Sequence, residues 1–308
     1  MRTLVTGGAG FIGSNIVALL VSEGHEVTVI DSMLTGYRSN LDGLGGVRLI
    51  EGDIRDESNI AAAADGAEVI FHLAASVGNK RSIEMPVDDA DINVIGTLRV
   101  LEAARKYGAR KVVFSSSAGI FGELETLPIA ETHPLEPDSP YGATKLCAEK
   151  LCLAYGRLYG FEAVALRYFN VYGINQRYDA YGNVIPIFAN RLIRNERLTV
   201  FSDGEQTRDF VNVKDVARAN YNAALADGVS GAYNVASGTR ITINELTRLM
   251  GEAAGIEPVV EYAPLRPGDV RDSLADISRA TGAFGYRPVI GLAEGLGEYM
   301  DWAKTLPE

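Results

Sequence analysis

The sequence predicts an α/β protein with a doubly wound parallel sheet and a smaller, mixed C-terminal domain. Short apolar runs alternate with longer amphipathic runs over the first 170 residues, which is the pattern of parallel strands covered by helices. Three glycines, Gly7, Gly10 and Gly13, follow the first apolar run directly, as in a tight turn from a strand into a helix. The chain has 308 residues, of which 47% are hydrophobic, so it can bury a large core.

The elements follow in order along the chain. Apolar runs predict strands at residues 2–5, 26–30, 47–50, 69–73, 111–115 and 163–166. Amphipathic runs between them predict helices at residues 11–22, 57–64, 89–107 and 141–159. Beyond residue 170 the order is irregular, with expected helices at 186–195, 214–226, 243–254 and 292–303 and a short apolar segment at 198–201. We therefore expect a Rossmann-type, nucleotide-binding domain over residues 1–170 and a substrate-binding domain over residues 171–308, interleaved with the first.

Composition narrows the class of partner. The formal net charge is −11 and no run of lysine or arginine occurs, which argues against nucleic acid or an anionic membrane as the main partner; solubility explains the charge more simply. Cys147 and Cys152 are five residues apart on one expected helix, so their side chains diverge and no disulfide is expected. With no signal peptide and no apolar run that could span a bilayer, we expect a soluble, cytoplasmic protein, and we expect no metal site.

The first turn is expected to bind a dinucleotide. Gly7, Gly10 and Gly13 lie between a strand and a helix, where missing side chains let a pyrophosphate approach the N-terminus of the helix. Asp31 closes the second strand and is placed to accept hydrogen bonds from an adenosine ribose. A carboxylate there would repel the additional phosphate of NADP, so NAD is preferred, although the nearby Arg38 leaves NADP open. Asp31→Ala should weaken NAD binding.

Two further strand ends extend this site. Asp53 follows the third strand and can reach an adenine amino group, but a helix cap at Asp53 or Asp56 explains the motif equally well. Small residues after the fourth strand would let the backbone lie against the cofactor. The residues expected to bind NAD are Gly7, Gly10, Phe11, Ile12, Gly13, Asp31, Ser32, Thr35, Gly36, Asp53, Ile54, Leu73, Ala74, Ala75, Ser115, Tyr141, Lys145 and Phe169.

Ser117, Tyr141 and Lys145 form the expected catalytic group. Tyr141 and Lys145 stand at positions i and i+4 of an expected helix, so they share one face, and an ammonium beside a phenol favours the phenolate. Ser117 lies just past the fifth strand, at the sheet edge where ligands bind. Each motif occurs by chance in many proteins, but their order after the glycine turn favours catalysis.

Six motifs carry a resemblance to a known family. They are residues 6–13, the serines 115–117, the Tyr141–Lys145 pair, residues 167–173, residues 207–211 and residues 266–269. Over essentially its full length the chain resembles the extended short-chain dehydrogenases/reductases, and most closely the UDP-glucose 4-epimerase group. The middle and late motifs are the most specific, because the glycine turn and the Tyr–Lys pair are common to the whole superfamily.

The resemblance implies an NAD-dependent interconversion of UDP-glucose and UDP-galactose. Tyr141, as phenolate, would take the proton of the sugar 4-hydroxyl while the C4 hydride passes to NAD. Ser117 would hold the same oxygen and relay its proton, and Lys145 would bind the nicotinamide ribose and lower the pKa of Tyr141. The 4-keto sugar would then turn over and take the hydride back on its other face.

The UDP-sugar is expected to bind to the later motifs. Arg208 and Arg266 can clamp a diphosphate in a bidentate way. The resemblance implies that Asn170 contacts the diphosphate, Phe201 packs against the uracil and Asp269 meets the uridine; a surface ion pair or a core aromatic remains the alternative for each. Ser273, small where the family associates a bulky residue with glucose and galactose, would admit an N-acetyl group. Ser273→Tyr should then reduce activity on UDP-N-acetylglucosamine and spare UDP-glucose.

Several related activities are weighed against this one. The related 4,6-dehydratases and sugar-acid decarboxylases carry an acid just after the position of Ser117, where this chain has Ala118 and Gly119; its first carboxylate downstream is Glu123. Reductases and 3,5-epimerases need further acid/base groups, which neither cysteine nor any of the three histidines matches. A 4-epimerase of UDP-N-acetylhexosamines or of UDP-uronic acids stays open, as does a cofactor-sensing regulator, against which the intact Tyr–Lys pair argues.

A homodimer is also expected. Family members pair through the helix before the serine strand and the helix that bears Tyr141. The latter helix offers apolar side chains for this, at Leu146, Leu151, Leu153 and Leu158, although the chain's own sheet could absorb them.

Overall fold

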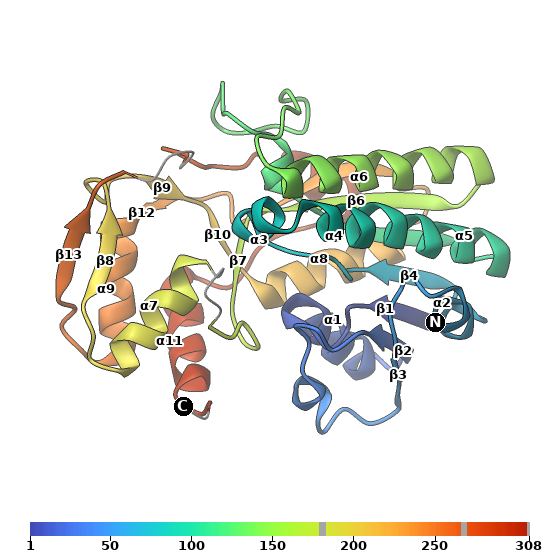
Figure 1. Ribbon diagram of the computed structural model, residues 1–308, viewed down its shortest axis with the longest axis horizontal. Coiled ribbons are helices and arrows are strands. Elements are labelled where there is room, and N and C mark those ends of the chain that lie inside the picture. The colour runs from blue at the N-terminus through green and yellow to red at the C-terminus, as the bar shows by residue number, and fades with distance from the viewer. Residues whose placement is uncertain (179–182, 266–269, 307–308) are drawn as a thin grey trace.

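A seven-stranded parallel sheet forms the larger part of the protein. The computed structural model describes residues 1–178, 183–265 and 270–306 (Figure 1). The strand order is β11-β6-β5-β4-β1-β2-β3, so the direction of winding reverses between β1 and β4, which is the switch point where such sheets bind ligands. The strands are β1 (Arg2–Thr6), β2 (Glu26–Asp31), β3 (Val47–Glu51), β4 (Val69–His72), β5 (Lys111–Ser117), β6 (Glu162–Tyr168) and β11 (Gly231–Val235).

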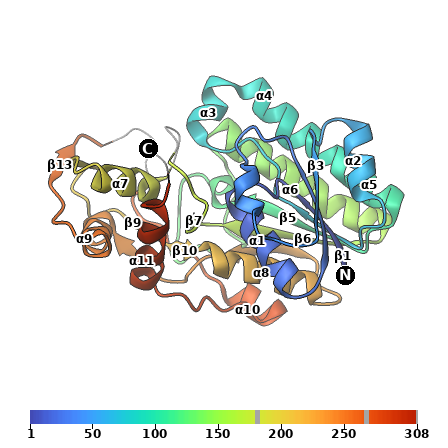
Figure 2. The ribbon, with the colours of Figure 1, turned by 90° about the horizontal axis from the view of Figure 1, so that it is seen from below.

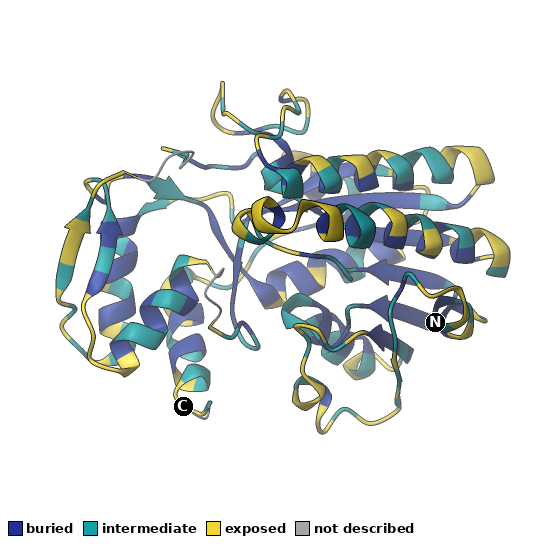
Figure 3. Cartoon of the chain, viewed as in Figure 1, coloured by how far each residue is buried: buried dark blue, intermediate teal, exposed yellow. Residues whose placement is uncertain are grey.

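Helices cover both faces of this sheet. Val5 and Phe71 belong to one core, with α1 (Phe11–Ser22) and α8 (Val213–Leu225). Their strand neighbours Leu4 and Ile70 belong to the opposite core, with α2 (Glu57–Ala64), α5 (Thr97–Tyr107) and α6 (Pro140–Tyr159). Because strand side chains alternate, each strand buries residues on both faces, and Figure 3 shows the strands buried between the two helical layers. The predicted doubly wound fold is confirmed.

The C-terminal part builds a separate core. Phe188, Leu246 and Met300 are buried in it together, and Figures 1 and 2 show it beside the sheet, on the side toward which the carboxyl ends of the strands point. Its sheets are two-stranded and pair β10 with β7, β12 with β9 and β13 with β8. Its elements are β7 (Asn170–Tyr172), α7 (Val184–Ile193), β8 (Leu198–Phe201), β9 (Thr207–Arg208), β10 (Phe210–Asn212), β12 (Ile241–Thr242), α9 (Ile243–Ala254), β13 (Val260–Ala263) and α11 (Leu292–Ala303).

Some elements differ from expectation. The helix predicted at residues 89–107 is divided into α4 (Pro86–Ala90), a π-helical segment at Asp91–Gly96 and α5, and it is preceded by α3 (Asn79–Glu84). Strands β11 and β13 and helix α10 (Ser278–Phe284) were not expected. Strand β11 carries Asn234, whose buried side chain donates to Ile129 O (2.9 Å) and Asp276 O (3.1 Å), so its sequence does not read as an apolar run.

The large sheet takes β11 from beyond residue 170, and α8 packs beside α1. Residue 170 therefore marks a change in sequence motifs and not the end of the large sheet. The division of the chain into two domains at this residue stays a prediction. Among the described helices, none is both long enough and apolar enough to cross a bilayer.

Candidate active site

The turn after β1 requires glycine at two positions. Gly7 has a φ of +69°, and a Cβ there would lie 2.7 Å from Ala74 N, just beyond β4. A Cβ at Gly13 would lie 2.1 Å from Gly7 O. Backbone therefore packs directly on backbone at the switch point. Among the described residues no side chain caps α1, and its first turn holds no acid, so the positive end of the helix can receive an anion.

A buried histidine that the sequence did not single out links these turns. His72 Nε2 lies 2.9 Å from Thr97 Oγ1, and His72 Nδ1 lies 2.7 Å from Thr6 Oγ1. Because the Thr97 hydroxyl donates to Asn93 O (2.6 Å), Nε2 is the donor to Thr97 and Nδ1 accepts from Thr6. Thr6 Oγ1 also accepts from Ala74 N (3.2 Å). Burial lowers the pKa of His72 to about 3, so the imidazole is neutral and its role is to orient the turn.

Asp31 supports the glycine turn. Its Oδ2 accepts from Ala9 N and its Oδ1 from Met33 N, both at 2.9 Å. A Cβ at Gly36 would lie 2.8 Å from Asp31 Oδ1, so the loop that carries Ser32, Thr35 and Gly36 passes closely over the carboxylate. Since an ionised carboxylate offers about four lone-pair sites, Asp31 retains acceptor capacity for a ribose.

Arg38 and Arg55, two cations close to the strand ends expected to bind the adenosine, are both paired. Arg38 forms an exposed ion pair with Glu51, at the end of β3. Arg55 donates to Asp53 Oδ2 (2.6 Å) and to Asp91 Oδ2 (2.6 Å), and its hydrogen bonds lower the pKa of Asp53. The cap of α2 is Asp56, which accepts from Ser58 N (2.8 Å). Capping thus does not explain Asp53, and its contact with adenine stays a prediction.

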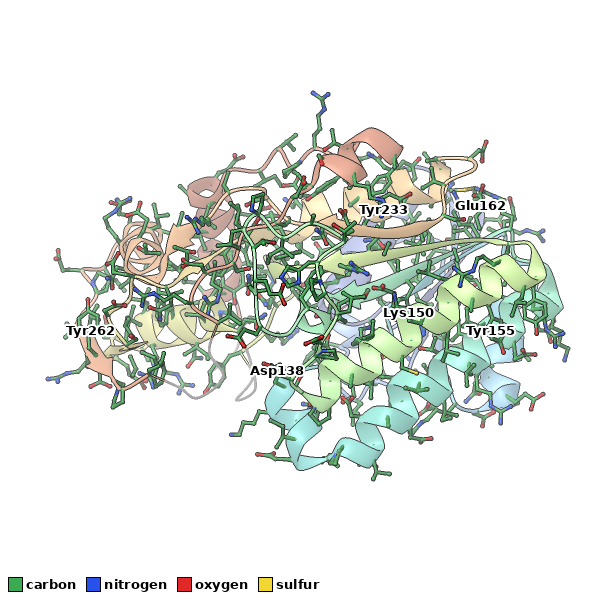
Figure 4. The ribbon with its side chains drawn as sticks, turned by 90° about the horizontal axis from the view of Figure 1, so that it is seen from above. Asp138, Lys150, Tyr155, Glu162, Tyr233 and Tyr262 are labelled. Carbon is green, nitrogen blue, oxygen red and sulfur yellow. The ribbon has the colours of Figure 1, made fainter. Side chains whose placement is uncertain are left out.

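Ser117 and Tyr141 meet where β5 ends and α6 begins. Ser139 caps α6 by accepting from Gly142 N (3.1 Å). A Cβ at Gly142 would lie 2.3 Å from Gly119 O, so the glycine lets the helix approach the turn that follows Ser117. A Cβ at Gly119 would lie 3.4 Å from Ser117 Oγ and 3.7 Å from the Tyr141 ring. In Figure 4 Asp138, two residues ahead of α6, lies at the junction of the two parts, so the helix begins there.

The pKa values of the Tyr141 phenol and of the Lys145 ammonium both differ from their ordinary values. Burial raises the pKa of Tyr141 to about 12; a hydrogen bond with Ser117 opposes this, and the charge of Asp89 adds to it. Without cofactor, burial outweighs the influences that lower this pKa, and the expected lowering by Lys145 stays a prediction. Burial also lowers the pKa of Lys145 to about 8, opposed by Asp89 and Glu149.

The environment of the Lys145 ammonium suits a ligand that can accept its hydrogen bonds. Its side chain is only 2% exposed, and its Nζ lies 4.6 Å from the centre of the Phe114 ring. Within the described ranges its ammonium makes no hydrogen bond or ion pair. A buried ammonium without hydrogen-bond acceptors is costly, so its environment fits a ribose whose hydroxyls would accept from it.

The expected substrate residues come from separate segments. Asn170 donates through N and Nδ2 to Asp209 O (3.2 and 3.0 Å), Arg208 Nη1 donates to Thr207 O (2.8 Å), and Phe201 ends β8. Ser273 is buried. Arg266 and Asp269 lie outside the described residues.

Asp209 connects these segments, and sequence reasoning missed it. It is fully buried and accepts from Ser237 N (2.8 Å), Ser237 Oγ (2.6 Å), Gly238 N (3.1 Å) and Ala275 N (3.2 Å). Burial raises its pKa, and these donors oppose the shift. Asp209 thereby joins β9, Asn170 and the end of β11 into one unit. Its place between Arg208 and an apolar pair was the available signal.

The remaining predicted cofactor residues occupy the same sheet edge or pack nearby. Ser115 hydrogen-bonds the Tyr168 hydroxyl, and the Phe169 ring packs 6.2 Å from that of Phe121. Ile54 is buried under Gly96. The others lie in the first turn of α1 or directly after β4, at Gly10, Phe11, Ile12, Leu73 and Ala75. Their contact with NAD stays a prediction.

Comparison with known proteins agrees with this arrangement. The family model described as "NAD dependent epimerase/dehydratase family" matches residues 3–236. A UDP-glucose 4-epimerase of Mycolicibacterium smegmatis is 38% identical over 99% of each chain. The structure of a Thermotoga maritima UDP-glucose 4-epimerase with UDP-glucose has a TM-score of 0.93 and 39% identity, over 99% of each chain.

A UDP-N-acetylglucosamine 4-epimerase of Methanobrevibacter ruminantium, in complex with UDP-N-acetylmuramic acid, has a TM-score of 0.94 and 35% identity, over 98% of this chain and 97% of that one. At this identity and coverage, relatives share family membership as well as the fold. The glycine turn, the Ser117–Tyr141–Lys145 group and these full-length similarities together show that the chain belongs to the NAD-dependent epimerase/dehydratase family.

Proposed function

We propose that this protein interconverts UDP-glucose and UDP-galactose by inverting carbon 4 of the sugar. The observation that carries the proposal is the arrangement where β5 ends and α6 begins: Ser117 and Tyr141 meet there, and the buried Lys145 ammonium on the same helix has no acceptor among the described residues. The full-length similarity to 4-epimerases supports the choice of reaction.

The described residues fit NAD. The uncapped N-terminus of α1, the glycine turn packed on Ala74 and the carboxylate of Asp31 suit the pyrophosphate and the adenosine ribose. Lys145 suits the second ribose. When bound, oxidised NAD supplies a positively charged ring that favours a phenolate nearby and a reversible acceptor for the hydrogen on carbon 4.

The chain's own residues handle the proton. Tyr141 takes it from the sugar 4-hydroxyl, and Ser117, which shares a hydrogen bond with the phenol, holds the same oxygen. Because burial raises the pKa of Tyr141 to about 12 without cofactor, the base becomes active only when positive charge surrounds it. Catalytic competence is thus coupled to cofactor binding.

The turn after β5 disfavours dehydration and decarboxylation. Both reactions need an acid beside Ser117, and Ala118 and Gly119 stand there. A side chain at Gly119 would touch Ser117 and the Tyr141 ring, so this is the place from which an acid would act. Glu123 is exposed, beyond the buried Phe121. The site therefore favours simple epimerisation.

A second substrate class is supported at Ser273. This residue is small and buried, where an aromatic side chain would take more space, and one relative of similar fold is in complex with an N-acetylated UDP-sugar. We include 4-epimerisation of UDP-N-acetylglucosamine in the proposal. In Ser273→Tyr, activity on that sugar should fall while activity on UDP-glucose remains, and equal loss of both would remove this extension.

We also propose a cytoplasmic homodimer that pairs through α5 and α6. Leu158 is 72% exposed on α6, and Ile95, just before α5, is exposed as well. Leu151 and Leu153 pack against the chain's own core instead, so they contribute less than the sequence indicated. Light scattering after size exclusion should give twice the 33.1 kDa chain mass.

Product analysis tests the reaction. The purified protein is incubated with UDP-galactose, first without and then with added NAD, and the hexoses are separated after hydrolysis. We expect conversion to UDP-glucose, and conversion without added cofactor would also establish a retained dinucleotide. No conversion of either UDP-hexose or UDP-N-acetylhexosamine with NAD present would contradict the proposal.

A further inference from the structure

A buried carboxylate lies behind the helix that carries Tyr141 and Lys145. Asp89, on α4, is fully buried, and its Oδ1 has no hydrogen-bond partner among the described residues. Buried carboxylates are normally paired or fully hydrogen-bonded, so this atom needs an explanation. Figure 1 shows α4 lying along α6.

Asp89 is attached to the catalytic helix between its two functional residues. Thr144 Oγ1, next to Lys145 in sequence, donates to Asp89 Oδ2 at 2.6 Å. Asn93 Nδ2 also donates to Asp89 Oδ2, at 3.1 Å, and lies 3.1 Å from Thr144 Oγ1. Asn93 in turn accepts from Ser76 N (2.8 Å), in the segment that follows β4. Asp89 thus connects α6 to the cofactor edge of the sheet.

The backbone is shaped to allow this cluster. Asp91–Gly96 forms a π-helical segment, a rare conformation that is frequent at functional sites. It divides the run that the sequence predicts as one helix. Asn93 lies inside this segment and Asp89 two residues before it, so the local change in helix pitch accompanies their approach to Thr144.

Asp89 is the uncompensated charge near Lys145. The other carboxylate that acts on Lys145 is Glu149, and it is neutralised by Arg167 in a buried, two-point ion pair of 3.0 and 2.7 Å. His72, at the end of β4, is neutral. Asp89 makes no ion pair within the described residues, and in both of its hydrogen bonds Oδ2 is the acceptor.

Other charged groups on elements that pack against α6 are engaged elsewhere. Asp91 pairs with Arg55, Glu102 with Arg105 and Tyr155, and Lys111 with Glu162; some of these pairs lie toward the far end of α6. The α3 residues Lys80, Arg81 and Glu84 each interact with other groups as well.

We propose that Asp89 is a positioning residue that supplies the counter-charge of the Tyr141–Lys145 pair and holds the pair in place through Thr144, a role that rests on the proposed function of those two residues. A negative charge at this place keeps the Lys145 ammonium protonated despite its burial. The same charge opposes the Tyr141 phenolate until a cofactor brings positive charge. Both directions agree with the effects of Asp89 on the two pKa values.

The isosteric change Asp89→Asn tests the charge. Its removal disfavours the ammonium and favours the phenolate, so both limbs of the kcat/KM pH profile should move to lower pH, each by on the order of half a unit or more. Asp88→Asn is the matched control, because Asp88 lies on the same short helix and is exposed; its limbs should not move. A lower kcat with unmoved limbs in Asp89→Asn would overturn the proposal.

A readout without turnover separates this inference from the proposed function. In protein carrying ¹³Cζ-tyrosine, the Tyr141 resonance is assigned by its loss in Tyr141→Phe and titrated with NAD bound. Its apparent pKa should fall in Asp89→Asn and stay in Asp88→Asn; no fall would overturn the proposal, even if the protein acts on another substrate. If wild type lacks activity while the resonance shifts, the proposed function fails and the charge coupling stands.

Thr144→Val tests the hydrogen bond that links Asp89 to α6. It removes the hydroxyl that binds Asp89 and keeps the charge, so kcat should fall while the limbs stay within about 0.2 pH unit, less than half the smallest shift expected for Asp89→Asn. An unchanged kcat in Thr144→Val would limit the role of Asp89 to its charge and overturn the positioning part. Should Asp89→Asn fail to fold, as judged by its thermal transition, Asp89→Glu serves the same titration and is expected to leave the limbs near their wild-type positions.

Discussion

The cofactor side and the substrate side of this site are built in different ways. The cofactor side uses consecutive strand ends of one sheet, with backbone packed on backbone at Gly7 and Ala74. The substrate side joins segments around residues 170, 208, 237 and 275, which meet at the fully buried Asp209: its backbone oxygen accepts from Asn170, and its carboxylate accepts from Ser237 and Ala275. A site made by one regular sheet can be predicted from short motifs, whereas a site made by distant segments depends on contacts between residues that lie far apart in the sequence.

The largest effect should come where the two sides meet. In Tyr141→Phe, loss of the proton acceptor should lower kcat by about 10²–10⁴-fold, while the retained NAD is unchanged. Tyr159→Phe, an exposed tyrosine at the end of the same helix, is the control and should leave kcat near wild type. Retention of full activity in Tyr141→Phe would remove the phenol from the mechanism. Initial rates and the NAD content of the denatured protein give both quantities.

On the cofactor side, Gly7→Ala should reduce NAD retention by about tenfold or more, because the methyl group must displace the backbone after β4 at a φ disfavoured for alanine. Gly24→Ala is a matched control: Gly24 has a similar φ of +76°, but a Cβ there meets nothing within 4 Å. Both variants carry the conformational cost of about 1 kcal/mol, and only the first should lose cofactor. Equal retention in the two variants would show that the close contact with Ala74 is not needed.

On the substrate side, Asp209→Asn should raise the KM for the UDP-sugar by about tenfold, since one lost charge-assisted hydrogen bond is worth roughly 1.5–3 kcal/mol, while NAD retention stays unchanged. Asp227→Asn, at a highly exposed carboxylate, should do neither. Loss of NAD in Asp209→Asn would mean that the two sides are not separable.

A smaller effect should appear in the pH dependence of stability. The pKa of buried His72 is lowered from 6.5 to about 3. Between these values the unfolded chain binds one proton more than the folded chain at this position, so stability is lost as the pH falls below about 6.5. Urea unfolding at several pH values should show this slope, and His72→Asn should make it shallower. An equal slope in both proteins would place the acid sensitivity elsewhere.

Prediction from sequence succeeded where chemistry and backbone pattern coincide. The glycine turn, Asp31 and the strand ends follow from spacing alone, because each strand of a doubly wound sheet ends at the same edge. Strand β11 was not predicted because Asn234 interrupts its apolar run. The Asn234 side chain donates to Ile129 O and Asp276 O inside the protein. The roles of Asp89, His72 and Asp209 were not predicted because their partners lie far away in the chain. A sequence also does not distinguish a buried polar side chain from an exposed one. For Tyr141, the spacing indicates the neighbouring charge of Lys145 but not the burial that raises the pKa of the phenol.

The fate of hydrogen at carbon 4 tests the central claim most directly. UDP-galactose deuterated at that carbon is converted by the purified protein in ordinary water, and the product is examined by mass spectrometry and NMR. An epimerase that removes and returns the same hydrogen predicts UDP-glucose with the deuterium still at carbon 4 and none released to the solvent. Protium at carbon 4 of the product, or a product that has lost water or a carboxyl group, would contradict the account.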